Sequence, residues 1–449
     1  MRRRLALILG ICTALTAGTA TAAGVWNPDQ PVGRAEAPAF GVPAEGESKA
    51  AASKKPADPT PRVAGAARRD PVVTAGAEEA GTVERAETTL GYVGTRKDAT
   101  FRYPGADYVK VHFTRLALLP GDHLTVSRPD GTESHRYDGK LLEGLGDTVN
   151  GLLGQNAGRW AMSVTGDTAI VKLHLANDLL GLRGGLAELG VTVDRVARGF
   201  TATERAAKRK ADDDRKRALA RDGREESVCG GDDKADAVCY KTTDPVMYRR
   251  SKAVARVLIH GTELCTAWRV GPDNRLLTNH HCFTTTEEAA DTEVWFNYQC
   301  ARCGGYEVFR PTKVWASQVL ATDKRLDYTL FSVDDFAAVE PFGYLQLDVR
   351  APVRGEQLYI PQNPAGEPTM IAVASDADRA GNCQVVDPAY DGYDTDTDAS
   401  YYCDTEGGSS GSPVLSRTTH KVVALHHFGG CPNSGVRIDQ IYKEIASLL

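Results

Sequence analysis

The sequence predicts an all-β protein in which a β-sandwich precedes a double β-barrel, and two patterns carry this prediction. In residues 86–200, short stretches such as 108–113 alternate apolar and polar residues between turns that contain Pro and Gly, which is typical of a β-sandwich. From Cys229 onward, many short apolar runs are separated by turns, and only residues 441–449 read as a helix. Many short strands followed by one terminal helix favour a double β-barrel.

The N-terminus has the pattern of a secretory signal. Arginines at positions 2–4 precede an apolar stretch at 5–15, and the Ala-Thr-Ala sequence at 20–22 offers a cleavage site. We therefore expect residues 1–22 to be a signal peptide. Because the apolar stretch is too short to cross a membrane as a helix, we expect a soluble protein that is secreted to the extracellular space.

Three segments separate this signal from the C-terminal half. Residues 23–85 are rich in Ala, Pro, Gly and charge, which predicts a disordered leader. Residues 86–200 contain no pattern that resembles a catalytic site, since their histidines are scattered. The β-sandwich is therefore expected to be an accessory or pro domain that serves binding, folding or inhibition. Residues 201–228 are almost all Ala and charge, and we expect a charged linker or solvated helix with basic clusters that could be processed. Residues 229–449 remain as the domain that carries the chemistry.

Composition limits the compartment and the partners. Of the ten cysteines, Cys12 lies in the signal and the other nine lie between Cys229 and Cys431, which indicates a disulfide-bonded C-terminal domain in an oxidising compartment. An odd number leaves one thiol free or paired outside the chain. The net charge of −6 argues against nucleic acid and polyanionic partners.

Residues 407–413 read GGSSGSP, a serine set in a glycine-rich turn. A serine hydroxyl is a poor nucleophile at neutral pH and needs a base, an orienting carboxylate and backbone N–H groups aimed at the developing oxyanion. Small residues let the backbone turn sharply. We therefore predict Ser410 as the nucleophile, with the N–H groups of Gly408 and Ser410 as the oxyanion hole. The alternative is a flexible Gly/Ser loop.

The base and its carboxylate are predicted from two other motifs. His281 stands directly before Cys282 at the end of an apolar run, while the adjacent His280 would point to the other face of an extended backbone. Asp327 opens the apolar strand at 328–333, and a buried aspartate there needs a partner such as a histidine N–H. The alternative for Asp327 is a turn residue that caps the strand.

Residues 229–449 resemble the chymotrypsin-fold serine endopeptidases, and among them the secreted bacterial lysyl and glutamyl (V8-like) endopeptidases. The order His, Asp, Ser matches that group. The segments 227–229, 237–239 and 261–266 (SVC, AVC and GTELCT), together with FNYQ at 296–299, are similar to the lysyl enzymes. The resemblance implies a chymotrypsin-like double β-barrel and hydrolysis of peptide bonds through an acyl-enzyme.

The same resemblance implies a set of disulfides. Cys300 would be the odd thiol, although an exchange of roles between Cys300 and Cys303 stays open. The expected pairs are Cys229–Cys431, Cys239–Cys303 and Cys265–Cys282, with Cys383–Cys403 as an additional bridge.

Two cues on substrate specificity conflict. No acid follows Cys431, where the lysyl enzymes carry their lysine-selecting carboxylate, but Asp404 matches the basic-residue selector of trypsin-like enzymes in its spacing from the nucleophile. His426 and His427 instead resemble the glutamyl enzymes, in which a histidine of this strand helps to bind an acidic side chain. Ser409 replaces the aspartate that pairs with a freed N-terminus in trypsin-like zymogens, so that activation switch is not expected.

Together these patterns predict a secreted serine endopeptidase that acts as a monomer on protein or peptide substrates, without a cofactor or metal and without binding nucleic acid or membrane. One alternative is a catalytically silent protease-like binding protein. The other is a cell-surface or wall-binding protein in which the β-sandwich has the main role.

Overall fold

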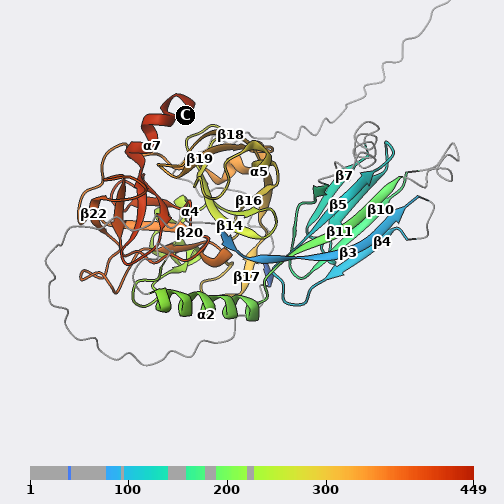
Figure 1. The fold of residues 1–449 in the computed structure, drawn as a ribbon, viewed down its shortest axis with the longest axis horizontal. Coiled ribbons are helices and arrows are strands. Elements are labelled where there is room, and N and C mark those ends of the chain that lie inside the picture. Colours follow the sequence, from blue (N-terminus) through green and yellow to red (C-terminus); the bar gives the residue numbers. More distant parts are fainter. Residues whose placement is uncertain (1–38, 42–76, 93–95, 140–157, 177–188, 220–226) are drawn as a thin grey trace, which may run out of the picture.

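The structure, a computed structural model, has a two-sheet unit on one side and a larger unit of two curled sheets on the other (Figure 1). It describes residues 39–41, 77–92, 96–139, 158–176, 189–219 and 227–449. The predicted signal peptide, 1–22, and most of the predicted leader lie outside these residues. No helix among the described residues is long and apolar enough to span a membrane.

The smaller unit is the predicted β-sandwich. Its apolar residues from both sheets, such as Val111, Phe113 and Val171, are buried together in one core. One sheet has the order β3 (Gly81–Gly91), β11 (Gly190–Gly199), β5 (Tyr108–Ala117) and β8 (Arg159–Trp160), with β9 (Val164–Thr165) also on β5. The other has the order β4 (Asp98–Arg102), β10 (Thr168–His174), β6 (His123–Ser127) and β7 (Ser134–Asp138).

Residues 77–85 are part of the described structure, so the leader prediction is wrong for its last part. Strand β3 starts at Gly81, and the short strand β2 (Glu78–Glu79) precedes it. Strand β1 (Ala39–Gly41) pairs with β17 (Glu307–Phe309). Because β3 is an edge strand with few large apolar residues, its composition resembles that of a loop.

The first sheet of the larger unit closes on itself as a barrel. Its strands are β13 (Val254–Ile259), β16 (Thr292–Phe296), β18 (Thr312–Asp323), β19 (Tyr328–Val333), β15 (Leu276–Thr278) and β14 (Glu263–Arg269), in that spatial order. Pairing of the first strand, β13, with the last, β14, closes the barrel. Strand β2 extends the same sheet, because Glu78 lies opposite Leu264 of β14. The segment that leads into β3, the first strand of the sandwich, is thus an extra strand of this barrel.

The second sheet has the order β12 (Ala235–Asp236), β21 (Met370–Ala372), β20 (Leu358–Gln362), β24 (Pro413–Ser416), β25 (Val422–Phe428), β26 (Asn433–Arg437), β23 (Asp398–Tyr401) and β22 (Val385–Tyr390). It also curls, because a β-bridge between Gln357, next to β20, and Gln384, next to β22, brings these two strands together. The all-β prediction with a double β-barrel is therefore confirmed.

Helices are more frequent than predicted. The terminal helix α7 (Ile438–Ile445) is present and starts three residues before the predicted one. The sequence did not predict α4 (Pro245–Ser251), which begins where the Asp244 side chain accepts from the Met247 N–H, or α5 (Thr286–Ala290), which begins with a capping box. Each of these is shorter than an average helix, so its apolar periodicity is hard to distinguish from that of a loop.

The predicted charged linker contains helix α2 (Ala202–Leu219), which runs along the larger unit (Figure 1). Arg205 is buried, and its Nε lies 3.6 Å from Oε1 of Glu367. Lys208 Nζ lies 2.6 Å from Oε1 of Glu78, next to the β2 pairing. Residues 202–219 are thus helical, and Arg205 and Lys208 of this helix form ion pairs with Glu367 and Glu78.

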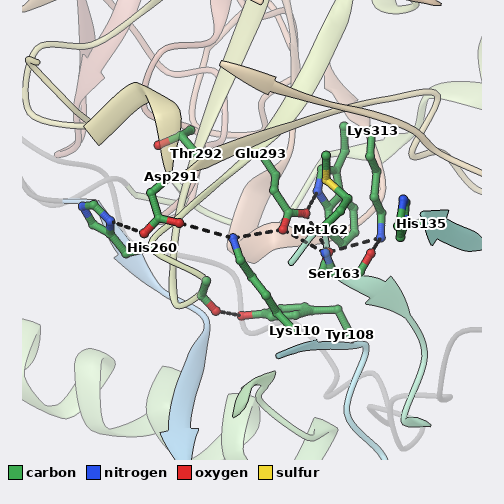
Figure 2. A network of polar contacts seen from close by, with 12 residues as sticks. Tyr108, Lys110, His135, Met162, Ser163, His260, Asp291, Thr292, Glu293 and Lys313 are labelled. Atoms are coloured by element: carbon green, nitrogen blue, oxygen red, sulfur yellow. Dashed lines mark hydrogen bonds and ion pairs between the residues drawn. The ribbon is translucent and has the colours of Figure 1, made fainter. Parts of the chain in front are cut away.

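The sandwich and the barrel share a buried network of charges, shown in Figure 2. Lys110 of β5 and Glu293 of β16 are both fully buried, with 3.0 Å between Nζ and Oε1. The Ser163 N–H and hydroxyl donate to the two oxygens of Glu293, at 2.9 and 2.6 Å. Lys313 of β18 donates to the Ser163 carbonyl at 2.9 Å and lies 2.8 Å from Oε1 of Glu133, just before β7.

An apolar cluster lies beside this network. Tyr108 of the sandwich packs edge-on against Trp295 of the barrel, with 6.1 Å between ring centroids, and its hydroxyl donates to the Gly261 carbonyl at 2.8 Å. Leu258, Leu264 and Ala80 belong to the same buried cluster. The contact thus resembles a domain core more than a loose linker-mediated contact.

Four disulfides join the pairs expected from the resemblance. Cys300 is buried and has no disulfide partner among the described residues, and burial raises the pKa of its thiol. The bonded pairs are Cys229–Cys431, Cys239–Cys303, Cys265–Cys282 and Cys383–Cys403.

Candidate active site

His281 and Asp327 meet because they flank paired strands. His281 follows β15 and Asp327 precedes β19, and Thr278 lies opposite Thr329 in that pair. The His281 Nδ1 lies 2.8 Å from Oδ2 of Asp327, and the His281 backbone N–H donates to Oδ1 at 3.0 Å. The carboxylate therefore fixes both the ring and the backbone of this histidine.

Asp327 is held in an unusual backbone conformation. Its φ is +44°, and the Asn279 side-chain amide donates to its carbonyl at 2.8 Å. The residue is 1 % exposed, and although burial raises the pKa of its carboxyl, the positive charge and hydrogen bonds of His281 and His427 hold that pKa well below its usual range. The carboxylate stays ionised in the neutral range. This role goes beyond that of a strand cap.

The Ser410 loop is anchored to β14. The Ser410 carbonyl accepts from the Thr266 N–H at 2.8 Å, and the Gly408 carbonyl accepts from the Thr266 hydroxyl at 2.8 Å. Gly411 requires glycine, because its φ is +88° and an added Cβ would lie 2.2 Å from the Thr266 carbonyl oxygen. The loop is therefore fixed against the barrel and is not a flexible Gly/Ser segment.

One disulfide joins this anchor to the histidine. Thr266 follows Cys265, which is bonded to Cys282, the residue after His281. A His281 ring nitrogen and the two sulfur atoms lie within 4.8 Å of one another. Because the sulfurs are joined in a disulfide, they are not thiolate ligands for a metal. The bridge therefore sets the position of the His281 loop relative to the Ser410 loop.

Ser409, the residue before the predicted nucleophile, is held by neutral partners. Ser409 is fully buried, and its hydroxyl donates to Oε1 of Gln362. The Gln362 side-chain amide in turn donates to the Asp404 carbonyl at 2.8 Å, and the Glu406 N–H donates to the Ser409 hydroxyl oxygen at 3.2 Å. These bonds order the loop without an ion pair to a freed N-terminus.

The carboxylate of Asp404 is occupied by backbone groups. Its Oδ1 accepts from the Cys229 N–H and its Oδ2 from the Asp233 N–H, both at 2.8 Å. Burial raises the pKa of Asp404 to about 6, although these two N–H groups act to lower it. The structure therefore favours a structural role for Asp404, whose hydrogen bonds join the start of the larger unit to the segment that leads to Ser410.

The two histidines of β25 have different partners, because successive residues of a strand point to opposite sides. His426 Nδ1 lies 2.7 Å from the Tyr401 hydroxyl, and both side chains are fully buried. His427 Nδ1 lies 3.0 Å from Oδ2 of Asp327, and its Nε2 lies 2.7 Å from Oδ2 of Asp398. Burial lowers the pKa of His427, but the two carboxylates outweigh it and raise the pKa to about 9.

Sequence reasoning missed this contact of His427 and did not name Asp398 at all. Alternation along an extended β25 was a usable signal, since it separates His426 from His427. No sequence signal pointed to Asp398, which lies 29 residues from His427 and reaches it across the curled second sheet, in which β26 lies between their strands.

Comparisons with known proteins identify the family of this chain. Residues 265–425 match the family described as the trypsin-like peptidase domain. The chain is also 31 % identical over 352 residues to Secreted RxLR effector protein 73 of Plasmopara viticola. That alignment covers 76 % of this chain and 79 % of the other protein. The chain belongs to the trypsin-like serine peptidases. Membership agrees with the predicted fold of the C-terminal half.

Other similarities are more distant. This peptidase is 28 % identical over 198 residues to the uncharacterised protein y4fB of Sinorhizobium fredii, covering 40 % of this chain and 28 % of that protein. It is similar to a solved Glu endopeptidase at 17 % identity and a TM-score of 0.35, covering 49 % of this chain and 98 % of that one. The inactive form of the Rv3671c protease of M. tuberculosis is 14 % identical, with a TM-score of 0.35, covering 46 % and 94 %.

Proposed function

We propose that this serine peptidase is a secreted endopeptidase whose catalytic residues are Ser410, His281 and Asp327. The observation that carries the proposal is the ionised, buried Asp327 bound to His281 Nδ1, beside a nucleophile loop that β14 holds in place. A fixed base and carboxylate next to a fixed serine is the arrangement that activates a hydroxyl for acyl transfer.

In this proposal Ser410 Oγ attacks the carbonyl carbon of the scissile peptide and transfers its proton to His281 Nε2. That nitrogen is buried and has no hydrogen-bond partner among the residues that the structure describes, so it is available for the proton. His281 then protonates the leaving amine, and water hydrolyses the acyl-enzyme by the reverse proton path. The N–H groups of Gly408 and Ser410 would stabilise the oxyanion.

For specificity, we favour an acidic side chain on the acyl side of the cut, read by His426. Both oxygens of Asp404 are bound to backbone N–H groups, so it is a poor selector for a cation. A histidine that can be protonated selects carboxylates, and His426 is fixed by Tyr401 on the face of β25 opposite Asp327. The His426→Gln variant should lose about 10–100-fold in kcat/KM on Glu substrates, while Asp404→Asn should leave the preference unchanged.

We also propose that the β-sandwich stays bound to the peptidase after any processing of the linker. The buried Lys110–Glu293 pair and the cluster around Tyr108 would leave charges and apolar surface exposed if the units separated. This supports an accessory domain that is part of the working enzyme. Secretion is supported by the signal-like N-terminus and by four disulfides.

The test is cleavage of a mixed peptide library by the full chain and its Ser410→Ala variant, with cut sites read by mass spectrometry. Ser134→Ala, an exposed serine of β7, is the matched control. We expect cuts by the parent and the control and none by Ser410→Ala. Absence of cleavage by all three would favour the silent binding protein, and ligand binding by the sandwich with its complete strand β3, residues 81–200, would then be measured.

A further inference from the structure

His427 makes two contacts that a neutral imidazole cannot satisfy together. Its Nδ1 lies 3.0 Å from Asp327 and its Nε2 lies 2.7 Å from Asp398, and the side chain is 1 % exposed. A neutral ring carries one N–H, so one nitrogen would present a lone pair to a carboxylate. Only the imidazolium donates on both sides. The geometry therefore indicates that the buried His427 is protonated throughout the neutral pH range.

Asp398 accepts hydrogen bonds from several side chains. It is fully buried on β23, its Oδ2 also accepts from the Ser434 hydroxyl at 2.8 Å, and its Oδ1 accepts from the Thr397 hydroxyl at 3.1 Å. The Tyr393 ring packs on His427 with 5.9 Å between centroids. Three donors, counting His427, thus fix the Asp398 side chain, and the Tyr393 ring covers the imidazole.

His427 and His281 share one oxygen atom. Both Nδ1 atoms lie within hydrogen-bond distance of Oδ2 of Asp327, at 3.0 Å for His427 and 2.8 Å for His281. A second donor on that oxygen limits rotation of the carboxylate. It also places a positive charge close to where His281 becomes positive during the reaction, with the compensating charge of Asp398 farther away.

We propose that His427, held protonated by Asp398, is a positioning residue that fixes the Asp327 carboxylate and moderates its negative charge for His281. This inference rests on the proposed function of the same site. His427 contacts no reacting atom in this role. Its charge opposes protonation of His281, because like charges in a buried site repel, so the pair extends peptidase activity towards acid pH.

The titratable groups that face His427 among the described residues are few. Asp327 comes from the loop before β19, His281 from the loop after β15, Asp398 from β23 and Tyr393 from the loop that precedes β23. The two carboxylates contact His427 directly through hydrogen bonds.

The decisive variant is Asp398→Asn, which keeps the side-chain volume and removes the charge. The asparagine amide can donate to a neutral His427 Nε2, and His427 Nδ1 can still donate to Asp327. The proposal predicts that the acid limb of the pH profile of kcat/KM moves to higher pH by roughly 0.5–1 unit, with KM little changed. His427→Gln, which also loses the ring, should lower kcat by about 10–100-fold.

A purely structural role predicts a different result. Asp398→Asn would then lower the melting temperature and leave the position of the acid limb where it is in the parent, which would overturn the proposal. A shift of the limb to lower pH would overturn it as well, because it has the opposite sign.

A second measurement does not depend on catalysis. In the full chain with Ser410→Ala and ¹⁵N-labelled histidine, NMR at pH 7 should show one buried imidazolium with two N–H protons, absent in His427→Gln and changed to one N–H in Asp398→Asn. One N–H on His427 in the parent would contradict the proposal. If the imidazolium is present but the parent cleaves no peptide, the proposed function fails while the assigned charge state of His427 stands.

Discussion

Two buried charge networks hold this molecule together, and they are built from different residues. Between sandwich and barrel, Lys110 and Lys313 meet Glu293 and Glu133. In the active site, two histidines alternate with two aspartates. Lysine and glutamate side chains ordinarily change charge far from neutral pH, whereas a histidine can change charge near neutrality.

The difference in residue type matches a difference in task. The interface network joins strands from two units and needs constant charge, since an unpaired buried charge is costly. The second network lies where the proposed mechanism moves a proton, and only His281 within it keeps a nitrogen without a partner among the described residues. Variants in the two networks should therefore differ in what they change.

The largest expected effect is on turnover, in the active-site network. Asp327→Asn should lower kcat by about 10⁴-fold, because an amide cannot hold His281 in the tautomer that accepts the serine proton. Steady-state kinetics on the best library peptide measure this. A loss below about tenfold would mean that Asp327 is only a structural partner of His281.

The next effect is on stability, in the interface network. Glu293→Ala should lower the free energy of unfolding by about 3–5 kcal/mol, because it leaves Lys110 and Lys313 buried with fewer partners. Chemical denaturation of the full chain is the measurement, and the double variant Lys110→Met with Glu293→Leu is the control. We expect the double variant to be more stable than Glu293→Ala, and the reverse order would show that the charges are not mutually compensating.

Acid should weaken the interface in a defined range. Burial raises the pKa of the Glu133 carboxyl, but Lys313 and His135 outweigh it and hold the pKa well below its usual range. Because the folded value is depressed, the stability from this group is present above the unfolded pKa of about 4.5 and is lost as pH falls below it. We expect Glu133→Gln to remove on the order of 2 kcal/mol of this acid dependence. Identical acid denaturation curves for parent and variant would contradict this.

The smallest effect belongs to an ion pair outside both networks. Lys208 of α2 and Glu78 of β2 are partly exposed, so Lys208→Ala should cost less than about 1 kcal/mol. Thermal melting of parent and variant decides this. A larger loss would show that α2 fixes β2 against β14 and would extend the interface network to the edge of the barrel.

The sequence was sufficient where local pattern and chemistry coincide. Alternating strands predicted the sandwich, and the motifs around His281, Asp327 and Ser410 predicted three residues whose loops the structure brings to one region. It was insufficient where contacts depend on the tertiary packing of distant segments. The partner of Asp398 is set by the second curled sheet, in which β26 lies between β23 and β25, and the partner of Lys110 is set by packing of β5 against β16 of the other unit. Strand β3 was missed because an edge strand needs few apolar residues.

The most direct test of the central claim is covalent trapping of the nucleophile. The full chain would be treated with a fluorophosphonate, which reacts with activated serines, and the adduct would be located by mass spectrometry. The account predicts a single adduct on Ser410 that is lost in His281→Ala and after denaturation. No adduct on the folded chain, or an adduct on Ser409 or another serine, would contradict the assignment of the active site.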